Sequence, residues 1–175
     1  MNHEPRTVNS EPSRIAKNWK ESTAETVQVV LPNDSNPLGF ILGGTVMHLI
    51  DITGAIACHR HTNTLALTAG VDGLEFIHPI KVGDLIILKS RVTCVFKTSL
   101  EVEVEVFSEQ IETGARRLTS RAYLTFVSID RDGKPLQVRP LLMETPDDEE
   151  RCRQAHERRA DRLRRKMAGG GAQKS

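Results

Sequence analysis

The chain has 175 residues, a length that suits one domain with tails. Hydrophobic residues make up 38% and charged residues 27%, which is typical of a globular protein and excludes a chain that is disordered throughout. The 24 Lys and Arg nearly balance the 23 Asp and Glu, so no overall field attracts nucleic acid or an acidic membrane. Aromatic residues are only 4%, which disfavours a stacking platform for single-stranded nucleic acid.

The first third of the chain runs from a polar start through a short strand to a helix. Residues 1–20 mix Pro, Ser, Asn and charge without apolar periodicity, so we expect a flexible arm there. Residues 26–31 form a β-prone run that Pro32 ends, and a loop rich in turn residues follows. From Thr45 to about His61, apolar residues recur at three- and four-residue steps, which predicts a helix.

Strand signals dominate after this helix, over residues 65–76, 84–96, 98–107 and about 115–129. Along the third strand apolar residues alternate with glutamates, and arginines on the fourth would pair with them across an antiparallel ladder. The connections are short, and short connections require antiparallel neighbours. One apolar sheet face and one helix to cover it predict an α+β fold, with an antiparallel sheet of about five strands wrapped around one long central helix.

The last segment, residues 145–175, is charged. An acidic cluster is followed by many arginines, an order that suits the helix dipole, but apolar residues are few. We expect a solvated, partly helical tail, and the alternative is a contact with phosphate or RNA. The folded domain is then expected at residues 21–144.

Targeting and cysteine patterns predict a cytoplasmic protein. No stretch approaches the roughly 18 apolar residues of a membrane span, and the polar N-terminus lacks the apolar run of a signal peptide. The three cysteines, Cys58, Cys94 and Cys152, are widely spaced and odd in number. They predict neither a disulfide framework nor a zinc site, and Cys58 and Cys94 are expected in the core.

Asp51 is the most informative residue. On the predicted helix it lies within or beside the apolar stripe, where an ionised carboxylate is costly unless it is paired or functional. One interpretation is a buried general base or nucleophile with a perturbed pKa. The other is a structural aspartate held by His48 or by a backbone amide.

The segment before this helix adds a second catalytic feature. Asn36 is followed by the pair Gly43-Gly44, whose free amides at a helix N-terminus could hold an oxyanion. Each feature alone is more typical of a turn. Their combination with Asp51 one to two turns later favours a catalytic site.

Residues 36–57, NPLGFILGGTVMHLIDITGAIA, resemble the signature of the hotdog-fold acyl-CoA thioesterases, in particular the hexameric YciA and brain acyl-CoA hydrolase group. Similar positions continue through the second strand and the last strand end, so the resemblance covers roughly residues 22–140. One departure is Asp34, which stands where the family usually has a histidine.

The resemblance implies a hotdog fold in which two subunits join into a continuous sheet and three dimers assemble. Active sites would lie at the dimer interface, with Asn36 of one subunit facing Asp51 of the other. Asp51 would activate water or attack the carbonyl, and the sequence leaves both routes open. Amides near Gly43 and Gly44 would hold the oxyanion, and Thr68 would position the water.

For the phosphates of CoA, the resemblance implies the loop of Lys97, Thr98 and Ser99, and Arg139 is a further candidate. On sequence alone each is more typical of a solvated group. No metal or organic cofactor is implied. The run His59-Arg60-His61 lacks a third ligand and is expected to be a solvated helix end.

The expected activity is hydrolysis of fatty acyl-CoA to a free fatty acid and CoA. One alternative is a non-catalytic hotdog domain that binds acyl-CoA as a sensor. Another is a hotdog hydratase or dehydratase, for which His48 near Asp51 is the available histidine. The combination of Asn36 and Asp51 favours the hydrolase.

Overall fold

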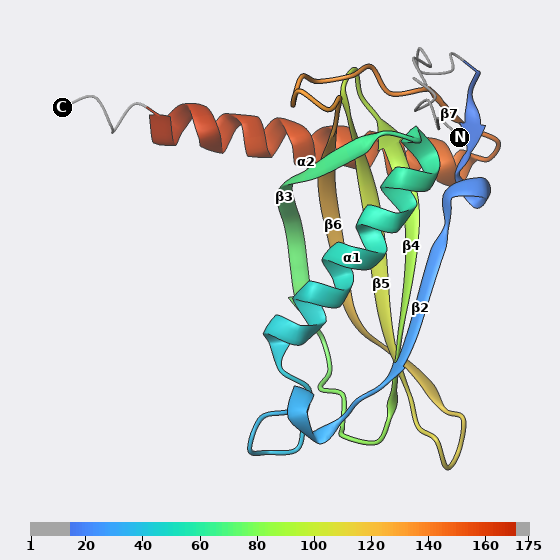
Figure 1. Cartoon of the computed structure of the whole chain (residues 1–175), viewed down its shortest axis with the longest axis vertical. Coiled ribbons are helices and arrows are strands. Elements are labelled where there is room, and N and C mark those ends of the chain that lie inside the picture. Colours follow the sequence, from blue (N-terminus) through green and yellow to red (C-terminus); the bar gives the residue numbers. More distant parts are fainter. Residues whose placement is uncertain (1–14, 171–175) are drawn as a thin grey trace, which may run out of the picture.

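The computed structural model describes residues 15–170 (Figure 1). The elements in chain order are β1 (Lys17–Asn18), η1 (Trp19–Ser22), β2 (Ala24–Val29), η2 (Pro32–Asp34), α1 (Gly43–Thr62), β3 (Leu65–Phe76), β4 (Leu85–Val95), β5 (Ser99–Glu109), β6 (Arg116–Ile129), β7 (Leu141–Leu142) and α2 (Pro146–Gly170). Among these residues, no helix has the length and apolar character needed to cross a membrane.

Five antiparallel strands form one sheet in the order β2-β4-β5-β6-β3. The sheet curves around α1, which lies diagonally across its inner face (Figure 1). The predicted α+β fold, with five antiparallel strands around one long helix, is therefore confirmed. β2 and β3 form the two edges, and β3 is bonded to β6 on one side only.

The core lies between α1 and the inner faces of the central strands. The buried stripe of α1 packs against the apolar residues of β4, β5 and β6. Gly54 permits close approach, because a Cβ atom at this position would lie 3.3 Å from the ring of Phe126. A fully buried Leu, Ile or Phe contributes about 1.5–3 kcal/mol, so this interface is the main source of stability.

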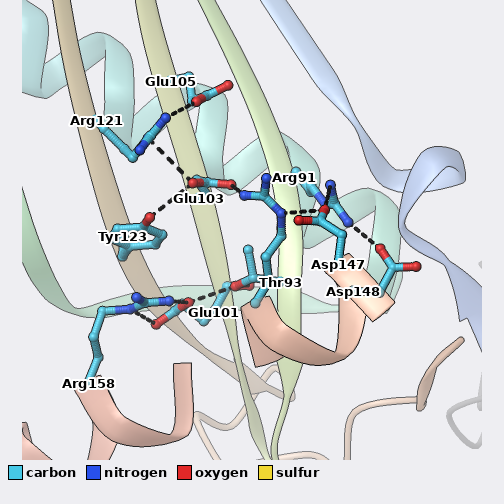
Figure 2. A network of polar contacts seen from close by, with 11 residues as sticks. Arg91, Thr93, Glu101, Glu103, Glu105, Arg121, Tyr123, Asp147, Asp148 and Arg158 are labelled. Atoms are coloured by element: carbon cyan, nitrogen blue, oxygen red, sulfur yellow. Dashed lines mark hydrogen bonds and ion pairs between the residues drawn. The ribbon is translucent and has the colours of Figure 1, made fainter. Parts of the chain in front are cut away.

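The C-terminal segment differs from the solvated tail that its composition predicts. α2 crosses the outer face of the sheet (Figure 1) and is fixed there by arginine–carboxylate pairs. Arg158 donates two hydrogen bonds to Glu101, of 2.8 and 2.9 Å, and stacks on the Tyr123 ring at 3.7 Å (Figure 2). Arg151 forms an ion pair with Glu103. Charged residues thus bury the outer face without an apolar helix stripe.

The predicted ladder of glutamates and arginines forms in part. Arg121 pairs with Glu105 at 2.6 Å, and Arg116 pairs with Glu109 at 2.5 Å, each across the β5–β6 register. Glu103 is shared between Arg121, at 3.6 Å, and Arg151 of α2, whereas Glu101 pairs with Arg158 of α2. The antiparallel ladder therefore satisfies only part of the β5 carboxylates.

The cysteine prediction is wrong in one respect. Cys94 of β4 and Cys152 of α2 form a disulfide, with their Cα atoms 4.6 Å apart. Their 58-residue separation gave no pairing signal, because only the docking of α2 brings them together. Cys58 is a buried free cysteine in the core, as predicted, and burial raises the pKa of its thiol to about 12.

The predicted N-terminal arm overlaps the described residues only at its end. Residues 1–14 lie outside the described part of the chain. Lys17–Asn18 pair in parallel with β7, and Asn18 caps η1 in a capping box with Glu21. Trp19 then packs under the guanidinium of Arg91 at 3.9 Å.

Candidate active site

Asp51 and Thr68 come together although 17 residues separate them. Asp51 lies on the side of α1 that faces β3, and the Thr68 hydroxyl donates a 2.7 Å hydrogen bond to its Oδ1. The Asp51 carboxylate is half-buried and not fully buried as expected, because β3 is an edge strand and leaves this side of α1 open in a single chain. Among the described residues, neither His48 nor a backbone amide is its partner; the hydroxyl of Thr68 takes that place.

The N-terminus of α1 presents backbone amides. Gly43 is the first helical residue, and its N-cap residue Leu42 provides no side-chain hydrogen bond. The first amides of a helix have no intrahelical acceptor, so those of Gly43 and Gly44 are available to an anion. A Cβ atom on Gly44 would meet no atom within 4 Å, which shows that this turn is open.

Phe76 is a site neighbour that the motif reading did not assign a role. A ring carbon of Phe76 lies 3.5 Å from the position that a Cβ atom on Gly43 would occupy, and Phe76 is 54% exposed. An aromatic ring beside open amides can pack against an apolar substrate group. Phe76 is among the positions that resemble the family's second strand, but the sequence could not show its contact with Gly43, because Phe76 is the last residue of β3 and reaches Gly43 only through the fold.

Asn36 closes its own loop. Its Oδ1 accepts from the amides of Leu38 at 3.0 Å and Phe40 at 3.2 Å. This arrangement is the turn that an isolated asparagine predicts, and it fixes the loop that leads into α1. Within the chain, no contact of the Asn36 side chain with Asp51 is formed among those described.

The two parts of the predicted site are separated along α1. Gly43 and Asp51 are eight residues apart on one helix, about 12 Å along its axis. One tetrahedral centre cannot contact both, because a hydrogen bond reaches only about 3 Å. A single chain therefore presents two half-sites.

The expected CoA-contacting residues lie at the opposite end of the sheet from the Asn36 loop. Lys97, Thr98 and Ser99 form the β4–β5 connection, in which Lys97 is exposed. This turn is held by a bond from the Val138 amide to the Lys97 carbonyl, of 3.1 Å. Arg139 follows directly, so the structure brings Arg139 and the Lys97 turn to the same end of the sheet.

The solvated helix end predicted for residues 59–61 is only partly correct. His59 and Arg60 are exposed, but His61 is fully buried. Its Nε2 lies 3.3 Å from the Arg139 carbonyl and its Nδ1 lies 3.2 Å from the Ser22 hydroxyl. Burial lowers the pKa of His61 to about 4, which keeps the imidazole neutral.

Other polar groupings lie on the outer face of the sheet, away from Asp51. A pocket of about 360 Å³ opens between η1, β4 and α2 and includes Trp19, Lys89 and Arg91 in its lining. Cys94, Cys152 and His156 have ligand-type atoms within 4.8 Å of one another, but both sulfurs already belong to the disulfide. None of these residues is among the predicted site residues.

A curved antiparallel sheet wrapped around one long helix is the hotdog fold, and here that helix carries an aspartate beside an edge strand. Residues 38–115 match the model of the thioesterase superfamily. The acyl-CoA thioester hydrolase YkhA of Bacillus subtilis is 37% identical over 129 residues, which are 74% of this chain and 75% of that protein. The chain belongs to the family of acyl-CoA thioester hydrolases.

Solved structures of acyl-CoA hydrolases have the same fold as this chain. An acyl-CoA hydrolase from Staphylococcus aureus, solved with butyryl coenzyme A and coenzyme A, superposes with a TM-score of 0.82 at 29% identity, over 90% of this chain and 96% of that one. A hexameric acyl-CoA thioesterase superposes with a TM-score of 0.82 at 35% identity, over 86% and 96%. The cytosolic acyl coenzyme A thioester hydrolases of human, rat and mouse are similar to this chain but longer. The chain spans about two fifths of their length, 37% to 40%.

Proposed function

We propose that this chain hydrolyses fatty acyl-CoA to a free fatty acid and CoA at a site built around Asp51. The carrying observation is the Thr68–Asp51 hydrogen bond, which fixes one carboxylate oxygen on the accessible side of α1. The second oxygen accepts no hydrogen bond from the described residues, so it can accept a proton from water or attack a thioester carbonyl. Both routes begin from the same geometry.

The tetrahedral intermediate needs a donor for its oxyanion. We assign this role to the open amides of Gly43 and Gly44, whose partial positive charge the dipole of α1 reinforces. Such donors are typically worth about 3–4 kcal/mol of barrier each. A carboxylate and backbone amides suffice for this chemistry, so we propose that no metal or organic cofactor takes part.

Because the half-sites of one chain lie about 12 Å apart, the complete site needs two subunits. We propose that Asp51 and Thr68 of one subunit face the partner's Asn36 and its helix N-terminus. The free edge of β3, beside Asp51, is where a second copy can pair. We propose a dimer as the active unit and three dimers per assembly, and the hexameric state of one relative supports an assembly of six subunits.

The Staphylococcus aureus structures support this set of residues. Alanine variants of that enzyme were solved at an asparagine, an aspartate and a threonine. The aspartate follows the asparagine by 15 residues and the threonine follows the aspartate by 17. Asn36, Asp51 and Thr68 have the same two spacings.

For the nucleotide portion of CoA we propose the turn of Lys97, Thr98 and Ser99, with Arg139 beside it. Cations attract the phosphates, and the Thr98 and Ser99 hydroxyls can donate to phosphate oxygens. The longer mammalian relatives are named cytosolic, which supports a cytosolic location for this chain.

The test is release of CoA thiol from a panel of acyl-CoAs, short to long, by the full chain and by Asp51→Asn. We expect hydrolysis by the wild type and a loss of at least about 100-fold in kcat for Asp51→Asn, because the base or nucleophile is removed. Asp132→Asn, at an exposed turn residue, is the matched control and should hydrolyse normally. Binding of acyl-CoA without turnover of any chain length would contradict the proposal and favour the sensor.

A further inference from the structure

α2 runs almost perpendicular to the strands. It contacts β4 at Cys152, through the disulfide, and β3 at Arg162, which pairs with Asp72. These two contacts are ten positions apart in the sequence, which corresponds to about 15 Å along the helix. The three strand spacings from β4 to β3 amount to about 14 Å. The two lengths agree only if the helix crosses the strands at a right angle.

The helix then continues beyond the sheet. Arg162 already lies over the edge strand. Its Cδ atom is 3.4 Å from the position that a Cβ atom on Gly70 would occupy. Eight further residues reach Gly170, an overhang of about 12 Å. Figure 1 shows this end of α2 extending past β3 with no strand of the same chain beneath it.

The overhang carries apolar side chains in solvent. Leu163 and Met167 lie one turn apart on the same side of α2 and are 44% and 82% exposed. The contacts described for Arg164 and Arg165 are with Asp161 of the same helix. A solvated helix end does not need two adjacent large apolar residues, so this surface fits a partner.

The edge beneath the overhang is itself open. β3 has twelve residues and pairs only with β6. Leu65 and Leu67, on the outer face of this edge, are 53% and 60% exposed. Exposed Glu75 on the same strand offers a carboxylate opposite in charge to the basic overhang. A long apolar edge strand pairs with another chain when one is available, and a second copy presents the same edge.

We propose that residues 163–170 of α2 dock on the outer face of a second copy of this chain. The inference rests on the dimer proposed above and names a surface that the active site does not include. When two β3 edges pair, each α2 overhang covers about two strands of the partner. Two-fold symmetry makes the contact twice per dimer. Leu163 and Met167 become buried, and Arg164, Arg165 and Lys166 come near the exposed Glu75 on β3 of the second copy.

The direct test is photo-cross-linking of the full chain with p-benzoylphenylalanine in place of Met167. We expect a covalent product of twice the 19.5 kDa chain mass. The same substitution at Ile111, 61% exposed on the β5–β6 turn, is the control and should give none. A Met167 variant that hydrolyses acyl-CoA and sediments as an oligomer, yet gives no cross-linked product, would overturn the inference and leave the proposed function standing.

A truncation after Arg162 provides the energetic test. It removes the overhang and keeps every contact described above between α2 and the sheet, so the subunit should still fold. We expect the dimer dissociation constant, measured by sedimentation equilibrium, to rise at least tenfold while kcat per dimer is unchanged. An unchanged dissociation constant would contradict the inference. A full chain that is monomeric and inactive would instead overturn the proposed function and, with it, the partner named here.

Discussion

The imidazole of His61 lies inside the domain, where its two hydrogen-bond partners fix its protonation state. The Arg139 carbonyl can only accept, so Nε2 carries the proton, and Nδ1 accepts from the Ser22 hydroxyl. Burial lowers the pKa of His61 to about 4, although the hydrogen bond to the Arg139 carbonyl acts in the opposite direction. The residue therefore ties η1, α1 and the Arg139 segment together as a neutral group.

This pKa predicts how stability depends on pH. Below about pH 6.5 the unfolded chain binds a proton at His61 that the folded chain does not bind until about pH 4. The folded state therefore loses stability as the pH falls, by about 2 kcal/mol between pH 7 and pH 5. The free energy of unfolding can be measured by urea denaturation at pH 7 and at pH 5. The decrease between the two pH values should be about 2 kcal/mol greater in the wild type than in His61→Gln. Parallel pH profiles would contradict the assignment.

At the residue scale, the sequence pointed to Asp51 and Thr68, which the structure brings into contact, but it did not predict how buried the side chains are. Asp51 was singled out because a carboxylate beside an apolar stripe needs a reason, and the structure gives it Thr68 as a partner. The sequence could not show that Asp51 is half-buried or that His61 is buried. Both depend on segments distant in the chain, β3 for Asp51 and the Ser22 and Arg139 segments for His61.

At the element scale, α2 shows how charged residues can dock a helix. Glu101 is only 1% exposed, and its carboxylate is matched by the two hydrogen bonds from Arg158 (Figure 2). Burying such a pair adds little net stability, but removing one partner leaves a charge without compensation. The outer face therefore depends on each arginine being present.

Arg158→Ala should lower the free energy of unfolding by about 3 kcal/mol, because it leaves the Glu101 carboxylate buried and unpaired. Arg153→Ala is the matched control: Arg153 is 58% exposed and pairs only within α2, so its loss should cost about 0.5 kcal/mol or less. Urea denaturation measures both. Equal losses in the two variants would show that α2 is not held by its buried ion pair.

The elements that were predictable are those with a strong period. Alternation over β5 and the three- and four-residue steps of α1 gave strands and a helix in the right order. The charge order of α2 predicted a helix. Its place on the sheet was not predicted, because it has no apolar stripe. It is held by the Cys94–Cys152 disulfide and by ion pairs between residues as far apart as Asp72 and Arg162, and such separations leave no local signal.

At the scale of the whole molecule, one chain is half of the proposed catalytic unit. The Asn36 loop and the amides of Gly43 and Gly44 lie at one end of α1, and Asp51 lies about 12 Å further along. The motif placed these residues within 16 positions of one another in the sequence. The helix rise separates them, and only a second subunit can join the two halves around one thioester.

Complementation between two inactive variants tests this shared site most directly. Asn36→Ala and Asp51→Asn are co-expressed with different affinity tags, and CoA release is compared with each variant alone. Random pairing makes half of the dimers mixed, and each mixed dimer holds one site with both residues intact, so activity should recover to about a quarter of the wild type. If Asn36 and Asp51 of the same subunit formed the site, every site in the mixed dimer would carry one lesion. Activity no higher than that of the separate variants would then contradict the account.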